Sequence, residues 1–400
     1  MKIIYAGEEM PEKITKSLFL AGPTPRNRDE VESWRPDALK ILEDIGFDGV
    51  VFTPEPREIK EDHDYEAQVE WEEDHLNVAD CIVFWVPRDL TLDSKDFPKM
   101  AAFTTNVEWG AWADSGKVVF GCPEDAEKVS YLKHYAEKYK VPAGETLTET
   151  LELALEKLGD GAERTGGERY VPLFIWNTKS FQSWHQAQKK AGHRLDRARL
   201  LYSYRPGFKA NVFLWIIQVK MWIEDQQRHH TNEFVLARTD ISATMLWRKL
   251  DPIESSELVL IKEFRPPART EDGFIREFPG GSSKEGTDPK ETAASEVHEE
   301  TGFFLESKRI KFHDSRQLAG TLSSHHSFFY SVELTEKEIE WFKSQKGIVH
   351  GKKEDNERTF IEVVTVKEFL KNKETDWSTL GMALSVIYGE ELNEEEENEK

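Results

Sequence analysis

The sequence predicts an α/β protein with two folded domains, and three observations support this prediction. Over residues 1–145, short apolar runs alternate with amphipathic segments of helical length. A stretch rich in glycine and charge, 159–167, interrupts that pattern. Further apolar runs then bracket a glycine-rich turn and a helix rich in glutamate. The chain has 400 residues, of which 38% are hydrophobic, enough for two or three domains with buried cores.

Four apolar runs in the N-terminal part have the length of strands, and each ends at glycine or directly before glycine or proline. Helical patterns separate them. Strands with so few polar residues are typical of a parallel sheet that helices cover on both faces. We therefore expect a doubly wound parallel-sheet (Rossmann-like) domain over 1–158. Its strands are expected at 17–21, 49–53, 81–86 and 117–121, and its helices near 31–45, 65–78, 106–114, 125–140 and 146–158.

The remaining chain divides where its pattern changes. We expect a linker at 159–169, a helical connecting segment at 170–205, a second α/β domain at 206–392 and a disordered acidic tail at 393–400. The connecting segment contains several Lys and Arg residues. A solvated helix face is one interpretation of these charges, and contact with a phosphate is the other. The second domain has strand-like runs at 212–217, 233–237 and 258–261.

Composition and charge narrow the class of protein. The net charge of −22 argues against general binding to nucleic acids or membrane surfaces. Cys81 and Cys122 lie in apolar, strand-like runs, so we expect buried thiols rather than a disulfide scaffold. The N-terminal segment lacks the regions of a signal peptide, and no apolar run is long enough to cross a bilayer. We therefore expect a soluble, cytoplasmic protein that acts on small molecules.

The most informative segment is a glutamate-rich helix that follows the turn Pro279-Gly280-Gly281. Asp288 can cap its N-terminus, and Gly302 suits its C-terminal stop. Three of its carboxylates project to one side, because residues three and four apart share a helix face. They are either a solvated acidic surface or the oxygen ligands of a hard divalent cation, and the glycine-rich entry favours the cation. These carboxylates belong to Glu296, Glu299 and Glu300.

This segment resembles the Nudix box, whose pattern is Gly-x5-Glu-x7-Arg-Glu-U-x-Glu-Glu-x-Gly-U, where U is apolar. The matching positions are Gly281, Glu296, Val297, Glu299, Glu300, Gly302 and Phe303. Thr287 stands in place of the family's first glutamate, and Ser295 stands in place of its arginine. The resemblance implies a Nudix α/β/α sandwich that binds Mg²⁺ (or Mn²⁺), and it implies a catalytic role for Glu299. The box implies Glu296, Glu299 and Glu300 as metal ligands, and the resemblance described next adds the Gly280 carbonyl to this metal set.

A neighbouring segment resembles the ADP-ribose pyrophosphatase branch of that family. Phe264-Arg265-Pro266-Pro267 precedes Glu277-Phe278-Pro279-Gly280. The resemblance implies that Arg265 contacts a phosphate, with a surface salt bridge as the alternative, and that Glu277 lies at the edge of the site. It also implies a catalytic glutamate in a later loop, Glu354 or Glu357, of which we favour Glu357. The implied reaction is attack of water on a diphosphate, with a glutamate accepting the proton.

In the N-terminal domain, functional residues are expected at the carboxyl ends of the parallel strands. Gly22-Pro23, Pro54-Glu55-Pro56 and Pro87-Arg88-Asp89 follow the first three strands. Thr104-Thr105-Asn106 then comes shortly before Glu108. We place Glu108 in the first turn of the next helix, where the helix dipole favours an ionised carboxylate.

These residues resemble the nucleoside 2-deoxyribosyltransferases and their nucleotide N-glycosidase relatives. The resemblance covers about residues 15–125 and rests on Phe19-Leu20-Ala21-Gly22-Pro23, Ala79-Asp80-Cys81-Ile82-Val83-Phe84-Trp85 and Thr104-Thr105-Asn106-Val107-Glu108-Trp109-Gly110. It implies that Glu108 is the nucleophile that attacks the sugar carbon bearing the base. The alternative for Glu108 is a residue that only complements the helix dipole. The resemblance also implies that Asp80 or Asp89 assists the leaving base, and the alternative for Asp80 is a capping residue. Gly22, Pro23 and Asn106 are the implied substrate-binding residues.

The two resemblances together predict a bifunctional enzyme of nucleotide metabolism. One site would cleave or exchange an N-glycosidic bond, and the other would use Mg²⁺ to hydrolyse a nucleoside diphosphate linked to another group, as in ADP-ribose. The alternative is a nucleotide-sensing or binding protein with a degenerate Nudix domain, which Thr287 and Ser295 motivate. A third possibility keeps only the N-terminal domain active. A homodimer is expected by analogy with both families.

Overall fold

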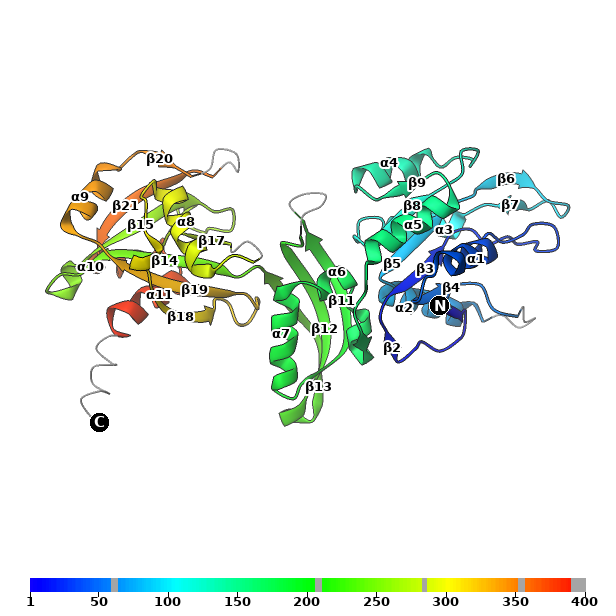
Figure 1. Cartoon of the computed structure of the whole chain (residues 1–400), viewed down its shortest axis with the longest axis horizontal. Helices are drawn as coiled ribbons and strands as arrows, with labels where there is room; N and C mark the ends of the chain where they lie inside the picture. The colour runs from blue at the N-terminus through cyan, green and yellow to red at the C-terminus, as the bar shows by residue number, and fades with distance from the viewer. Residues whose placement is uncertain (59–63, 206–210, 283–285, 352–356, 390–400) are drawn as a thin grey trace. The chain divides into compact units, whose positions relative to one another are not determined.

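The computed structural model describes residues 1–58, 64–205, 211–282, 286–351 and 357–389. The chain folds into two compact units, unit 1 over Met1–Ala237 and unit 2 over Arg238–Lys400. Each unit can be followed in Figure 1, where unit 1 runs from blue to green and unit 2 continues to red. The expected acidic tail, 393–400, lies outside the described residues, as does Glu354.

Unit 1 is built on a six-stranded sheet in which every neighbouring pair is parallel. The order is β1-β4-β3-β5-β8-β9. The four expected strands are confirmed as β3, β4, β5 and β8, and their residues are buried along the whole length of each strand. The strands are β1 (Lys2–Tyr5), β3 (Ser17–Ala21), β4 (Val50–Thr53), β5 (Cys81–Trp85), β8 (Val118–Gly121) and β9 (Ala143–Gly144).

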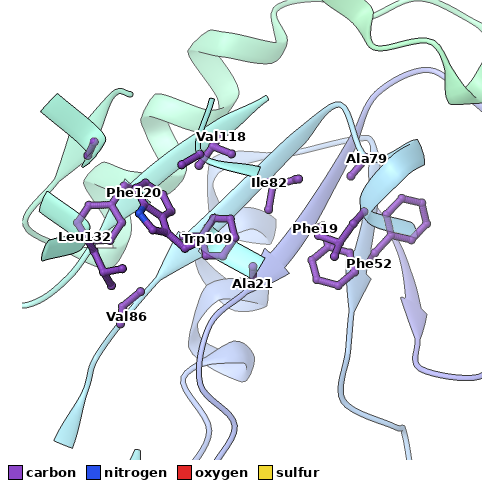
Figure 2. Close-up of a cluster of buried hydrophobic side chains, with 14 of the residues drawn as sticks. Phe19, Ala21, Phe52, Ala79, Ile82, Val86, Trp109, Val118, Phe120 and Leu132 are labelled. Carbon is purple, nitrogen blue, oxygen red and sulfur yellow. The ribbon is translucent and has the colours of Figure 1, made fainter. Parts of the chain in front are cut away.

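Helices cover both faces of this sheet, which confirms the doubly wound fold. One core cluster joins the sheet to α2, α3 and α4, and the other joins it to α1 and α5. In Figure 2, Trp109 of α3 packs against Phe120 of β8, with ring centroids 5.0 Å apart. The helices are α1 (Arg35–Ile45), α2 (Tyr65–Val78), α3 (Phe103–Trp112), α4 (Ser130–Lys138) and α5 (Leu147–Leu158).

The segment after α5 differs from the expected plan. Part of the expected linker is a strand, β10 (Arg164–Thr165), which pairs with β2 (Lys13–Ile14). The short helix η1 (Gly166–Tyr170) follows, and α6 (Leu173–Trp176) and α7 (Lys179–Lys190) then precede a three-stranded sheet. That sheet consists of β11 (Arg194–Tyr204), β12 (Leu214–Ile223) and β13 (Arg228–Arg238). It shares a core with α6 and α7 around Phe181 and Trp215.

This arrangement changes the expected boundaries. The connecting segment 170–205 contains the strand β11, and β12 lies in unit 1 rather than in a C-terminal domain that starts at residue 206. Strand β11 was missed because its register with β12 shifts between Leu195 and Arg197 and again between Leu200 and Tyr202. Such irregularities break the two-residue period that identifies a strand from its sequence.

Unit 2 is built on a mixed sheet with the order β18-β19-β14-β15-β21-β20. Strands β14 and β19 are parallel, whereas β15 runs antiparallel to both β14 and β21. Two short strands join its path, β16 (Phe274–Glu277) beside β15 and β17 (Gly280–Ser282) beside β14. The others are β14 (Ile241–Arg248), β15 (Glu257–Phe264), β18 (Lys311–Gln317), β19 (His326–Glu333), β20 (Val349–His350) and β21 (Thr359–Thr365).

Helices pack on both faces of this sheet too, which confirms the α/β/α sandwich. One core contains residues of α8 (Pro289–Thr301) and α9 (Glu336–Ser344), and the other contains residues of α10 (Val366–Phe369) and α11 (Trp377–Ile387). The ends of α8 follow the prediction. The Asp288 carboxylate accepts a hydrogen bond from the Lys290 amide, and Gly302 ends the helix in the left-handed conformation.

The prediction for the two cysteines is also confirmed. Cys81 in β5 and Cys122 directly after β8 are buried, free thiols, as expected. Among the described residues, every helix is too short or too polar to cross a bilayer.

Candidate active sites

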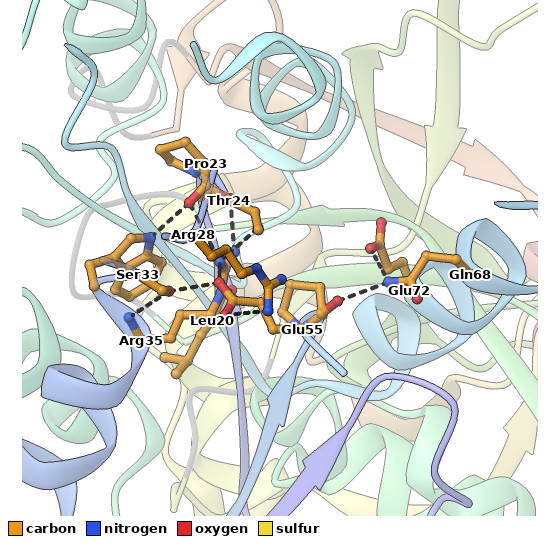
Figure 3. Close-up of polar contacts among 12 residues, drawn as sticks. Leu20, Pro23, Thr24, Arg28, Ser33, Arg35, Glu55, Gln68 and Glu72 are labelled. Atoms are coloured by element: carbon orange, nitrogen blue, oxygen red, sulfur yellow. Dashed lines mark hydrogen bonds and ion pairs between the residues drawn. The ribbon is translucent and has the colours of Figure 1, made fainter. Parts of the chain in front are cut away.

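At the carboxyl edge of the sheet in unit 1, the buried side chain of Arg35 holds the loop that follows β3. Its guanidinium donates hydrogen bonds to the carbonyls of Leu20 and Gly22 at 3.0 and 2.8 Å, and to Glu55 Oε1 at 2.5 Å. A weaker contact reaches the Pro23 carbonyl at 3.4 Å. Figure 3 shows this network converging on Arg35. The predicted substrate-binding residues Gly22 and Pro23 therefore lie at this edge, but their carbonyls are engaged by Arg35.

Gly22 is required at its position by close packing. A Cβ atom there would lie 2.2 Å from the Trp85 carbonyl oxygen, and the backbone has a φ of +149°. Strands β3 and β5, which end at this point, are neighbours in the sheet. The chain continues from β3 to β4 on one side and then crosses to β5 on the other side, so a crevice is expected here.

Glu108 lies in α3, in the second turn rather than the expected first turn, because the helix begins at Phe103. The helix dipole therefore has less influence on it than we expected. Burial raises the pKa of Glu108 to about 7, the negative charge of Glu72 adds to the effect, and Arg35 opposes it. Glu72 belongs to α2, and its Oε1 accepts a hydrogen bond of 2.6 Å from Gln68. Gln68 also donates to the Pro54 carbonyl at 2.9 Å, which ties Glu72 to the loop after β4.

Glu72 and Glu108 both line a cavity of about 620 Å³. Helices α2 and α3 form one part of its wall, and residues 199–203 of β11 form another. Strand β11 is held to α2 by an ion pair of 2.6 Å between Arg197 and Asp74. The segment that we expected to be a connector therefore contributes to the pocket that contains Glu108.

The two other polar residues predicted at this edge have local partners. Asn106 accepts a hydrogen bond of 2.5 Å from Arg88 Nη2, while Arg88 Nη1 donates to the Lys128 carbonyl at 2.9 Å. Asp89 accepts hydrogen bonds from the side chain and amide of Thr91, and these bonds lower the pKa of Asp89. Asp89 begins β6 (Asp89–Leu92), which pairs with β7 (Pro98–Met100). It does not line the cavity that contains Glu108.

Asp80 lies elsewhere, because it precedes β5 and therefore sits at the amino end of that strand. Its two carboxylate oxygens accept hydrogen bonds of 2.7 and 2.6 Å from Arg164, and both side chains are fully buried. Ser17 Oγ donates a further bond of 2.9 Å. This placement supports a structural role for Asp80 and does not support contact with a leaving base.

In unit 2, Glu300 is the carboxylate of α8 that points most deeply into the domain. It is 1% exposed, and its Oε2 accepts a hydrogen bond of 2.8 Å from the Gly280 amide. Glu296 faces the same turn, because a Cβ on Gly281 would lie 2.4 Å from the Glu296 carboxyl carbon. Burial raises the pKa of Glu300 well above its ordinary value. The Gly280 bond opposes this shift, and the charges of nearby carboxylates, Glu296 first among them, add to it.

Two carboxylates from outside the helix meet Glu300. Glu263 of β15 and Glu357, which precedes β21, each place one carboxylate oxygen in a group with Glu300 whose members all lie within 4.8 Å of one another. Burial raises the pKa of Glu263 to about 7, and Arg265 opposes that shift. Glu357, for which the sequence predicted a catalytic role in a later loop, thus lies close to Glu300, and Glu263 was not expected in this group.

Glu299 takes a different direction from Glu300. Its Oε1 accepts a hydrogen bond of 2.8 Å from Ser295 Oγ, the residue at the arginine position of the box. It is absent from the carboxylate group around Glu300. Thr287, at the position of the box's first glutamate, contacts the Thr292 hydroxyl at 3.3 Å.

Arg265 bridges two carboxylates at the edge of this group. Its Nη2 lies 2.6 Å from Glu277 Oε1 and 2.9 Å from Glu263 Oε2. Arg265 is thus positioned beside the acidic group, and Glu277 holds it there. Both of the interpretations that the sequence left open for Arg265 remain compatible with this contact, because the guanidinium has further donors available.

These residues fit the divalent cation that the Nudix resemblance implies. Carboxylate and carbonyl oxygens are the donors that Mg²⁺ and Mn²⁺ prefer, and two of the three clustered carboxylates are buried. When bound, such a cation polarises phosphoryl oxygens and lowers the pKa of an attacking water.

Fold and sites together define a two-domain α/β protein with carboxylates at the edge of a parallel sheet and in a separate sandwich. Comparison with family models agrees. Residues 15–126 match the model described as nucleoside 2-deoxyribosyltransferase like, and residues 251–380 match the NUDIX domain. The chain therefore joins a nucleoside 2-deoxyribosyltransferase-like domain to a NUDIX domain. A search of curated proteins returned no match.

Proposed function

We propose that unit 1 breaks or exchanges an N-glycosidic bond of a nucleoside or nucleotide through Glu108. The observation that carries this proposal is the placement of Glu108 beside Glu72 in a cavity of about 620 Å³. A drug-sized or nucleotide-sized ligand fits cavities of this size. The match of residues 15–126 to a deoxyribosyltransferase-like family supports the same reaction class.

The two carboxylates suit a double displacement. In the first step a Glu108 oxygen attacks the anomeric carbon, the C–N bond breaks, and its electron pair leaves with the base. Glu72 is our candidate source of the proton that the departing base takes up, because it lines the same cavity as Glu108. In the second step water or another base attacks the same carbon, and the bond to Glu108 breaks.

For unit 2 we propose metal-dependent hydrolysis of a nucleoside diphosphate linked to another group, with ADP-ribose as the leading candidate. The NUDIX match and the buried carboxylates around Glu300 support this activity. Arg265 beside the carboxylates is suited to contact a phosphate oxygen.

The test is to incubate the full chain with Mg²⁺ and a panel of nucleosides and nucleotides that includes ADP-ribose, and to separate the products by chromatography. We expect free base from the first site and a nucleoside monophosphate from the second. Glu108→Ala should remove only the first product, and Glu300→Gln should remove only the second. If both variants retain full activity, or if the wild type releases neither product, the assignment is wrong.

The second candidate function is nucleotide binding without turnover in unit 2. Ser295 contacts Glu299 where the Nudix pattern has arginine, and this departure favours the alternative. Calorimetry with ADP-ribose and Mn²⁺, followed by product analysis of the same sample, separates the two functions. Binding with no product would select the sensor.

We also propose that the protein forms a homodimer, by analogy with both families. Light scattering coupled to gel filtration of the full chain tests this, and a monomeric mass would contradict it.

A further inference from the structure

The acidic group of unit 2 is assembled by three separate elements, and the sheet register explains why they meet. Glu263 pairs with Thr359 across the antiparallel strands β15 and β21. Glu357 precedes Thr359 by two residues, so it enters the sheet at the same end. Thr359 Oγ1 donates a buried hydrogen bond of 2.7 Å to the Glu300 carbonyl, which fixes the last turn of α8 against β21.

The direction of Glu263 follows from the alternation of β15. Side chains two residues apart share a face of a strand, so Glu263 lies on the same face as Val259. Val259 belongs to the core cluster that contains Ala293 and Val297 of α8. Glu263 therefore points toward the helix that carries Glu300. It is 8% exposed, although it is the second-last residue of its strand.

The positive charge available to this group is small. Arg265 is the only cation that contacts Glu263 among the described residues, and its Nη2 is shared with Glu277. Glu300 receives a backbone hydrogen bond but no ion pair from the described residues. Clustering three carboxylates, two of them buried, around one shared arginine is costly, because the buried charges lose their hydration and all three repel one another. A divalent cation with oxygen ligands removes that imbalance.

We propose that Glu263, Glu300 and Glu357 hold the divalent cation of unit 2, so that strand β15 supplies a ligand from outside the glutamate-rich helix. This inference deepens the proposed hydrolase function, on which it rests for the identity of the ion. It also assigns different roles to two carboxylates of α8. Glu300 binds the ion directly. Glu299 does not bind it, because its carboxylate accepts a hydrogen bond from Ser295 and lies outside the group.

Mn²⁺ binding to the metal-free full chain tests the proposal without any substrate. Free Mn²⁺ is measured by electron paramagnetic resonance during a titration. Glu263→Gln and Glu357→Gln should each weaken binding about tenfold or more, since loss of an oxygen ligand costs at least as much as loss of a supporting residue. A tenfold loss of affinity corresponds to about 1.4 kcal/mol. Glu299→Gln is the matched control on the same helix and should change the affinity by less than about twofold.

Thermal melting shows whether Glu263 acts through the ion or only through Arg265. If Glu263 is a ligand, Glu263→Gln relieves repulsion, so the metal-free protein should melt at the same or a higher temperature, and added Mn²⁺ should stabilise it less than wild type. A Glu263→Gln variant that melts lower without metal but keeps wild-type Mn²⁺ affinity would overturn the proposal. So would a Glu299→Gln variant that loses as much affinity as Glu263→Gln.

Failure of this inference is distinguishable from failure of the proposed hydrolase. Mn²⁺ binding that depends on Glu263, without hydrolysis of any diphosphate, leaves the ion site in place and removes the catalytic function. If the Glu263→Gln variant still hydrolyses the diphosphate and binds Mn²⁺ with unchanged affinity, the hydrolase function stands and Glu263 is not a metal ligand.

Discussion

Glu72 of α2 and Glu108 of α3 line one cavity, and the charge of Glu72 adds to burial in raising the pKa of Glu108 to about 7. This shift has a physical cause, because ionising Glu108 near the charge of Glu72 places two negative charges in a poorly solvated space. Arg35 moderates this effect, but its guanidinium is already bound to Glu55. The raised pKa places the ionisation of Glu108 close to physiological pH.

The first prediction concerns the pH profile of base release. A Glu108 nucleophile must be ionised, so kcat/KM should rise with pH and reach half of its maximum near pH 7. Glu72→Gln removes a negative charge and should move that midpoint to lower pH. The same profile measured for Glu70→Gln, an exposed residue of the same helix, should match wild type. A midpoint that stays in place in Glu72→Gln would show that Glu72 does not influence the nucleophile.

The second prediction concerns stability. The pKa of Glu108 is raised in the folded state from an ordinary value of 4.5 to about 7, so the folded protein retains a proton that the unfolded chain releases. Stability is therefore lost as pH rises from about 4.5 through 7, and the loss is complete above pH 7. Glu108→Gln removes this loss. Urea unfolding should show the variant to be more stable at pH 8, by at most about 3 kcal/mol, and equally stable at pH 4. Lower stability at pH 8 would contradict the assigned environment.

Local sequence signals predicted much of the fold. The second helix was expected at 65–78 and α2 spans Tyr65–Val78, and the caps of α8 lie at Asp288 and Gly302. Such features depend on residues close together in the chain, namely a capping carboxylate, an apolar period and a glycine stop. Strand β11 lacked such a signal, because shifts in its pairing interrupt the alternation of buried side chains.

Site residues could be predicted from the sequence only where a single motif contains them. Glu108 and Glu300 stand in recognisable motifs, whereas Glu72 sits in a helix with four other acidic residues and nothing local distinguishes it. Glu263 offered one usable signal, a glutamate at an inward-facing position of an apolar strand. Its partners, Glu300 and Glu357, are 37 and 94 residues further along the chain, so only the sheet register brings them together.

The third prediction tests the structural role of Asp80. Asp80→Asn leaves the fully buried Arg164 without its charge partner, so the free energy of unfolding should fall by about 3–5 kcal/mol. The rate of base release per folded molecule should stay within about twofold of wild type, because Asp80 does not line the cavity that contains Glu108. The control is Glu163→Gln. Glu163 directly precedes β10 and forms an exposed ion pair with Lys13 of β2, so its loss should cost less than about 1 kcal/mol. A large loss of rate in folded Asp80→Asn protein would restore the catalytic interpretation.

The fourth prediction tests whether β11 belongs to the glycosidic site. Tyr202 lines the cavity with Glu108 although it is 52% exposed, whereas Tyr204, two residues further along the strand and 46% exposed, does not. An aromatic wall residue contributes about 1 kcal/mol to binding of a ring, so Tyr202→Ala should raise KM for base release about fivefold to tenfold. Tyr204→Ala should leave KM unchanged, and neither variant should alter metal-dependent hydrolysis by unit 2. Equal kinetics for both variants would mean that the cavity wall formed by β11 does not contact the substrate, and that the site is complete within the six-stranded sheet and its helices.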